Sequence, residues 1–256
     1  MSTLTKAPLI EAIVEIRWGN LDKNADHPDT IALTFSKEDI NFFPGQFHGI
    51  AAKNGFTFVE TINEPQIPHL VNYRFRKHEN TWPCYQIGLG LFTVNQINNG
   101  YEWNTFKQDV LAGLQMLDEG HPLTISKLPI IYIELRYQDG FFFEENESPS
   151  EFLQKKMNFS FNPPDPFLNG SFLKKNVHGH NIKFQVETLE PPGILRFEIM
   201  QAVINSRGGF AMNTIMRSKP PSLDIDLFLA WLEKAHSAQK HAFETLINPS
   251  YLESFK

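Results

Sequence analysis

The chain has 256 residues, a formal net charge of −6, a hydrophobic fraction of 41% and a single cysteine, Cys84. An acidic chain lacks the broad basic field of non-specific nucleic-acid binders. One cysteine excludes an internal disulfide and a cysteine-based structural zinc site. We see no signal peptide and no apolar run near the roughly 18 residues of a membrane span, so we expect a cytoplasmic protein.

The first half of the chain predicts a strand, a helical segment, three further strands and a long helix. Apolar and polar residues alternate from Ile10 to Trp18, as in a half-buried strand. Ser36 and Asp39 fit a capping box, although Pro44 and Gly45 interrupt soon after and favour a helix at 46–54 instead. Three strands and an amphipathic helix then follow, at 56–63, 69–77, 85–96 and 103–117.

The second half of the chain predicts the same order of elements. It opens on a long strand region at 123–143, followed by a short helix that begins at Ser148. Three strands are expected at 182–189, 194–204 and 210–217. The last long helix has Asp226 as its expected N-cap and ends at Asn248-Pro249, with one extra turn beyond.

A short motif links the two halves. Residues 13–18 read IVEIRW and residues 132–137 read YIELRY, so both share the pattern aliphatic, Glu, aliphatic, Arg, aromatic. Each copy opens a half with the same order of elements. The sequence therefore predicts an α+β fold of two similar halves, 1–120 and 121–256. Each half is expected to be an antiparallel sheet with a long helix packed on it, a helix-grip-like tandem repeat.

The repeated motif supplies the first candidate site. Glu15 and Arg17 are two positions apart and share one strand face, as do Glu134 and Arg136. If the two strands lie near a pseudo-twofold axis, two arginines would clamp an anionic ligand while two glutamates act as acid or base. The alternative is a structural ion-pair ladder, either on a solvent-facing surface or on the surface between the halves.

A second candidate surface surrounds Gly88-Leu89-Gly90. Thr93 stands where a dinucleotide fingerprint needs its third glycine, so we interpret this segment as mid-strand. The glycines leave one sheet face bare, for a ligand or for a closely packed helix. Three aromatic residues flank the segment and are candidate ligand contacts: Tyr85, Tyr101 and Trp103.

No catalytic residue, metal site or cofactor is predicted from the sequence. The nine histidines lack metal-ligand spacing, and Asp224 and Asp226 suit the start of a helix better than a metal. Cys84 has no catalytic signature around it, and no serine occupies a nucleophile-elbow motif.

Four segments spread along the chain carry a family resemblance: APLIEA at 7–12, YQIGLG at 85–90, LRY at 135–137 and LDID at 223–226. Together they resemble a sporadically distributed bacterial family of uncharacterised proteins of about this length. Typical members carry Asn two places after LRY, where this chain has Asp139. The resemblance implies no catalytic residues. Sporadic occurrence implies an accessory component, such as part of an anti-phage (antiviral) defence or toxin–antitoxin system.

The leading functional prediction is a non-enzymatic binding or assembly subunit with a protein partner or a homo-oligomeric state. The C-terminal helix and Phe255 form its candidate interface. The alternative is a small anionic-ligand-binding protein or enzyme that uses a cleft between sheet and helix, with Arg17 and Arg136 as anion anchors. Nucleic acid, membrane and cofactors are not expected as partners.

Overall fold

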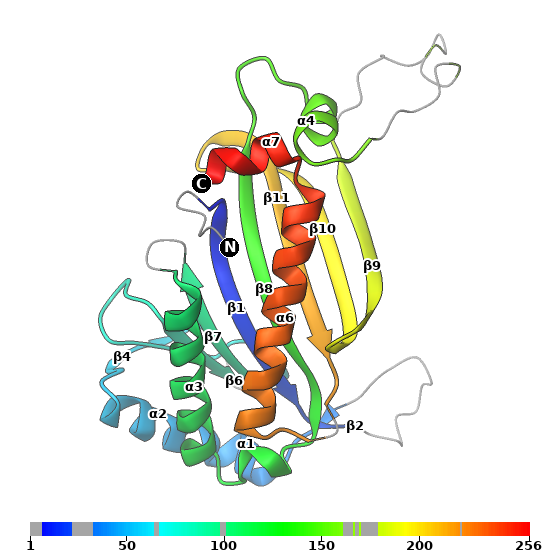
Figure 1. The fold of residues 1–256 in the computed structure, drawn as a ribbon. Helices are drawn as coiled ribbons and strands as arrows, with labels where there is room; N and C mark the ends of the chain where they lie inside the picture. Colours follow the sequence, from blue (N-terminus) through cyan, green and yellow to red (C-terminus); the bar gives the residue numbers. More distant parts are fainter. Residues whose placement is uncertain are drawn as a thin grey trace.

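The computed structural model describes residues 7–21, 33–63, 67–97, 101–160, 166, 169, 179–220 and 222–256. Within these ranges nine strands form one antiparallel sheet in the order β4-β5-β6-β7-β1-β8-β11-β10-β9 (Figure 1). The strands are β1 (Leu9–Trp18), β4 (Phe58–Thr61), β5 (Tyr73–Arg76), β6 (Cys84–Gly88), β7 (Leu91–Ile97), β8 (Ile130–Phe142), β9 (Asn181–Leu189), β10 (Pro192–Ile204) and β11 (Arg207–Ser218). A separate ribbon pairs β2 (Asn20–Leu21) with β3 (Leu33–Thr34). The predicted α+β class is confirmed.

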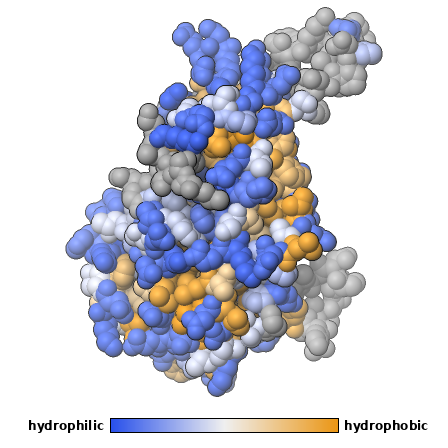
Figure 2. Space-filling model, in the orientation of Figure 1, coloured by the Kyte–Doolittle hydropathy of each residue, from blue (hydrophilic) through white to orange (hydrophobic). Residues whose placement is uncertain are grey.

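Helices cover one face of the sheet (Figure 1). They are α1 (Lys37–Asn41), α2 (Phe43–Lys53), α3 (Trp103–Gly120), α4 (Pro149–Lys156), α6 (Ile225–Leu246) and α7 (Pro249–Leu252), with single 3-10 turns at Ile125–Lys127 and Glu253–Phe255. Seen from this side, the surface is mostly hydrophilic with scattered apolar patches (Figure 2). No described helix is long and apolar enough to cross a membrane.

The core lies between the helices and the sheet. On β1 the residues Ala12, Val14, Ile16 and Trp18 are all fully buried, which is the alternation that the sequence predicts. The helix α3 packs close at Gly113, where an added Cβ atom would lie 2.7 Å from the Tyr85 ring. A second apolar cluster under α4 and α7 includes Phe255. Phe255 is therefore part of the core, and the prediction of a free interface at this residue is wrong.

A buried polar cluster fastens α1 to the sheet. Ser36 and Asp39 form the capping box that the sequence suggests. The Asp39 carboxylate accepts a hydrogen bond from the Trp18 indole at 2.6 Å and lies 2.9 Å from Nε2 of His121. Burial acts to raise the pKa of Asp39, but the hydrogen bonds from His121, Trp18 and Ser36 outweigh it and lower the pKa to about 2.

The first strands of the two predicted halves lie side by side at the centre of the sheet. The strands β1 and β8 run antiparallel, with Glu15 directly opposite Glu134 and Arg17 opposite Tyr132. The strands that close each half, β7 and β11, flank this central pair. The predicted seam between 1–120 and 121–256 thus falls inside one continuous sheet.

Two local predictions are wrong. The segment 85–96 is a hairpin of β6 and β7, because the backbone turns at Leu89-Gly90, where Gly90 has φ +69°. No helix packs on these glycines: a Cβ atom on Gly88 would collide with the backbone oxygen of Leu70. The N-cap of α6 is Asp224, whose carboxylate accepts hydrogen bonds from two backbone N–H groups, rather than Asp226.

Candidate functional site

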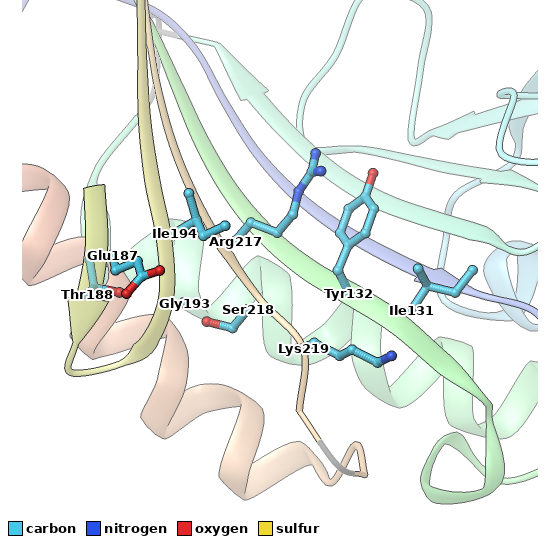
Figure 3. Close-up of a pocket in the computed structure, with 9 residues that line it drawn as sticks. All are labelled: Ile131, Tyr132, Glu187, Thr188, Gly193, Ile194, Arg217, Ser218 and Lys219. Carbon is cyan, nitrogen blue, oxygen red and sulfur yellow. The ribbon is translucent and has the colours of Figure 1, made fainter. Parts of the chain in front are cut away.

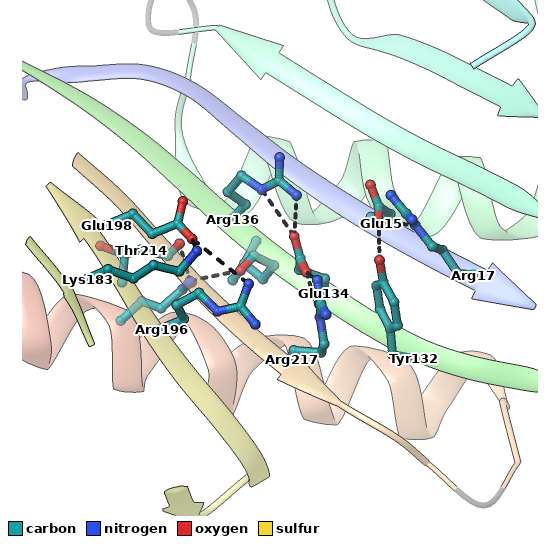
Figure 4. A network of polar contacts seen from close by, with 12 residues as sticks. Glu15, Arg17, Tyr132, Glu134, Arg136, Lys183, Arg196, Glu198, Thr214 and Arg217 are labelled. Atoms are coloured by element: carbon teal, nitrogen blue, oxygen red, sulfur yellow. Dashed lines mark hydrogen bonds and ion pairs between the residues drawn. The ribbon is translucent and has the colours of Figure 1, made fainter. Parts of the chain in front are cut away.

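The most highly charged part of the described sheet lies on the face opposite the helices, which we call the open face. Strand alternation directs the core residues of β1 toward the helices and Glu15 and Arg17 toward the open face. The neighbouring strands add Tyr132, Glu134 and Arg136 from β8 and Arg217 from β11, as Figure 4 shows. Residues from three strands therefore meet over the central seam.

Glu134 anchors two arginines. Its side chain is fully buried, and each carboxylate oxygen accepts two hydrogen bonds from one guanidinium. Arg136 donates to Oε1 at 3.1 and 2.5 Å, and Arg217 donates to Oε2 at 2.9 and 2.6 Å. Burial acts to lower the pKa of Arg136, but the negative charge of Glu134 outweighs it and raises the pKa. The four hydrogen bonds hold both guanidinium groups in one orientation.

Next to Glu134, Glu15 holds a third arginine, Arg17. Its Oε1 accepts hydrogen bonds from Nε of Arg17 at 2.6 Å and from the Tyr132 hydroxyl at 3.0 Å. The Tyr132 ring lies between the side chains of Arg217 and Arg17 in Figure 4, with their Cζ atoms 3.9 and 5.4 Å from the ring centroid. Both contacts are in the range of cation–π attraction. Burial raises the pKa of Tyr132, so its hydroxyl keeps its proton.

The charged surface continues onto the outer strands. On β10, Arg196 lies 3.9 Å from Glu198, which also pairs with Lys183 of β9 at 2.8 Å. We call Arg17, Arg136, Arg196 and Arg217 the arginine row. The row and Lys183 together supply five cations. The same surface carries three carboxylates, from Glu15, Glu134 and Glu198, so it is locally positive in a chain whose net charge is −6.

The arginine row has unused hydrogen-bond donors. In Arg17, Arg136 and Arg217, the carboxylates engage the Nε edge of the guanidinium, and no described residue accepts from Nη1. These side chains are about one-third exposed, at 27, 32 and 34%. A guanidinium that is already held at one edge, with N–H donors available at another, loses little conformational entropy when it binds a carboxylate or phosphate. The row is therefore a preformed surface for anionic groups.

The predicted site residues divide between the two faces. Glu15, Arg17, Glu134 and Arg136 come together on the open face, so the predicted cleft between sheet and helix does not contain the two arginines. Tyr85, Tyr101 and Trp103 lie on the helix side. The Tyr85 hydroxyl donates to the backbone oxygen of Asp109 under α3.

Sequence reasoning missed five members of the open-face site: Tyr132, Lys183, Arg196, Glu198 and Arg217. Arg217 ends a strand that was predicted, and Tyr132 opens the second copy of the repeated motif. The alternation of side chains along each strand could have shown which of these residues share a face of the sheet. The strand order that brings them together is set only by the tertiary fold.

A second polar cluster joins α3, β8 and α6 on the helix side. The Tyr101 and Tyr137 hydroxyls are 2.9 Å apart, and the Tyr137 hydroxyl is 2.8 Å from Nδ1 of His236, whose ring stacks on Trp103 at 3.8 Å. Burial lowers the pKa of His236 to about 4, so its imidazole is neutral at pH 7 and shares one hydrogen bond with the Tyr137 hydroxyl. Nearby Asp139 is buried, and no described residue donates a hydrogen bond to its carboxyl group.

Neither cluster has the composition of a metal centre. Within the described ranges, no three His, Cys, Asp or Glu side chains gather in a way that could hold a metal ion. No model of a known protein family matches the chain, and no curated protein or solved structure does. The candidate site therefore rests on the geometry of the open face, and the family resemblance stays a prediction.

Proposed function

We propose that the protein is a non-enzymatic binding subunit whose open face docks an acidic segment of a protein partner. The observation that supports this most is the arginine row, in which buried carboxylates hold three guanidinium groups with one edge free. Arginine forks match carboxylates in a bidentate geometry. If the family resemblance holds, the partner is another component of a defence or toxin–antitoxin system, and its gene lies beside the gene for this protein.

A protein partner suits this face better than a nucleic acid. Three glutamates interrupt the arginine row, whereas a phosphate backbone favours an uninterrupted positive track. Apolar side chains, including half-exposed Ile194, occupy the same face. Arginine, tyrosine and apolar groups together are the composition of protein–protein hot spots.

Fluorescence anisotropy with labelled poly-L-glutamate tests the proposal. The variant Arg17→Gln/Arg196→Gln removes two cations without touching Glu134. We expect salt-sensitive binding by the natural protein and binding at least about tenfold weaker for the variant, since each lost charged hydrogen bond costs about 1.5 kcal/mol or more.

The matched control is Lys53→Gln, which removes an exposed cation from α2 on the other side of the sheet. It should bind poly-L-glutamate as the natural protein does. Equal weakening by the control, or no weakening by the double variant, would contradict docking on the open face. Tighter binding of polyuridylate than of poly-L-glutamate would favour a nucleic-acid partner instead.

We also propose that the fold arose as a tandem repeat of residues 1–120 and 121–256. Support comes from the order of elements, since each half runs from a central strand through a meander to a long helix over the same face. Superposing β1, β7 and α3 on β8, β11 and α6 tests this idea. A match confined to the two central strands would contradict it.

A further inference from the structure

A hollow of about 470 Å³ lies at one end of the open face, where Arg217 of the arginine row forms part of its lining (Figure 3). Strands β8, β9, β10 and β11 all contribute to its lining, and Lys219 follows directly after β11. This volume is in the range of small-molecule sites.

Gly193 lets two of the lining strands come close together. A Cβ atom there would lie 2.2 Å from the backbone oxygen of Arg217, so only glycine lets β10 approach β11 this closely. The hydroxyl groups in the lining are already engaged, since Thr188 donates to Pro191 and Ser218 to Pro192. Charged side chains therefore supply the polar groups that remain free for a ligand.

The charges of the lining are of both signs. Lys219 and Glu187 are exposed, and neither forms an ion pair within the described part of the chain. Glu187 lies on β9 and Lys219 follows directly after β11, and the guanidinium of Arg217 adds positive charge beside Tyr132. Ile194 supplies an apolar part of the lining. A ligand that satisfies the whole lining needs a negative group, a positive group and an apolar part.

We propose that this hollow binds a small zwitterion, such as an amino acid, a dipeptide or a phosphorylated amine. Its carboxylate or phosphate contacts the Lys219 ammonium, its amino group contacts the Glu187 carboxylate, and its carbon chain packs on Ile194. This site goes beyond the docking of an acidic protein segment, because the two charged side chains that contact the ligand, Lys219 and Glu187, lie outside the arginine row.

Isothermal titration with leucine, glycyl-leucine and O-phosphoethanolamine tests the site, with acetate and butylamine as probes of single charge. We expect at least one zwitterion to bind more tightly than either singly charged probe. Lys219→Gln and Glu187→Gln should each weaken that binding about tenfold, the equivalent of about 1.4 kcal/mol. Ile194→Trp, which fills the hollow from a half-exposed position, should abolish it.

The control is Lys183→Gln, which removes a cation of the open face that does not line the hollow. It should leave zwitterion binding unchanged. Failure of all three zwitterions to bind the natural protein would overturn the proposal, as would unchanged binding in Lys219→Gln and Glu187→Gln. Neither result bears on Arg17 and Arg196, so the proposed docking function is tested separately.

Discussion

Replacing Arg136 and Arg217 together by Met is expected to lower the free energy of unfolding by about 3–5 kcal/mol. Glu134 is fully buried, and these two arginines supply all four of the hydrogen bonds that its carboxylate accepts. Without them a buried negative charge has no partner. Chemical denaturation at pH 7, followed by circular dichroism, measures the loss.

The triple variant with Glu134→Gln added should recover much of the lost stability, because a neutral amide costs less to bury than a carboxylate. The matched control is Arg17→Gln/Arg196→Gln. It should cost about 1 kcal/mol or less, since Glu15 keeps its hydrogen bond from Tyr132 and the guanidinium of Arg196 is only distantly paired. A double Met variant as stable as this control would show that Glu134 does not depend on its arginines.

Asp139→Asn is expected to stabilise the protein by about 4 kcal/mol at pH 8. Burial raises the pKa of Asp139 from 3.8 to about 7, so the folded state favours the protonated acid. As pH rises from about 4 to about 7, the unfolded chain releases this proton first, and stability falls by about 1.4 kcal/mol per pH unit. Asparagine removes this loss.

Thermal or urea unfolding at pH 4 and pH 8 measures the effect. The two proteins should be similar in stability at pH 4 and differ at pH 8. Glu145→Gln is the control, because Glu145 is exposed and has no ion pair within the described residues. It should change stability little at either pH. An Asp139→Asn protein no more stable than the natural one at pH 8 would mean that the carboxyl group has a partner in solution.

The central part of the fold was predictable from local patterns. Alternation in IVEIRW and YIELRY fixes which side chains share a face, and the repeat pointed to the two strands as a seam. In the structure β1 and β8 are neighbours, and Glu15 lies opposite Glu134. The four predicted charged residues therefore meet on the open face.

The remainder of the site depends on contacts that local patterns do not encode. Tyr101 and Trp103 are near Gly88 in sequence, but they pack with Tyr137 and His236 on the helix side. The run of apolar residues around Leu89 predicted one strand, but it forms a hairpin of two strands. The hydrophobic periodicity of a sequence does not locate a two-residue turn. Arg217 reaches Glu134 only because β11 pairs with β8 across a long stretch of intervening chain.

Arginine labelling is the most direct test of docking on the open face. The protein isolated from its native host with its partner, and the protein alone, are treated with phenylglyoxal and compared by mass spectrometry. We predict slower modification of Arg17, Arg136 and Arg196 in the complex. Arg207 should react equally in both, since it lies ten residues along β11 from Arg217, about 33 Å away. Unchanged reactivity of the arginine row in the complex would contradict the account.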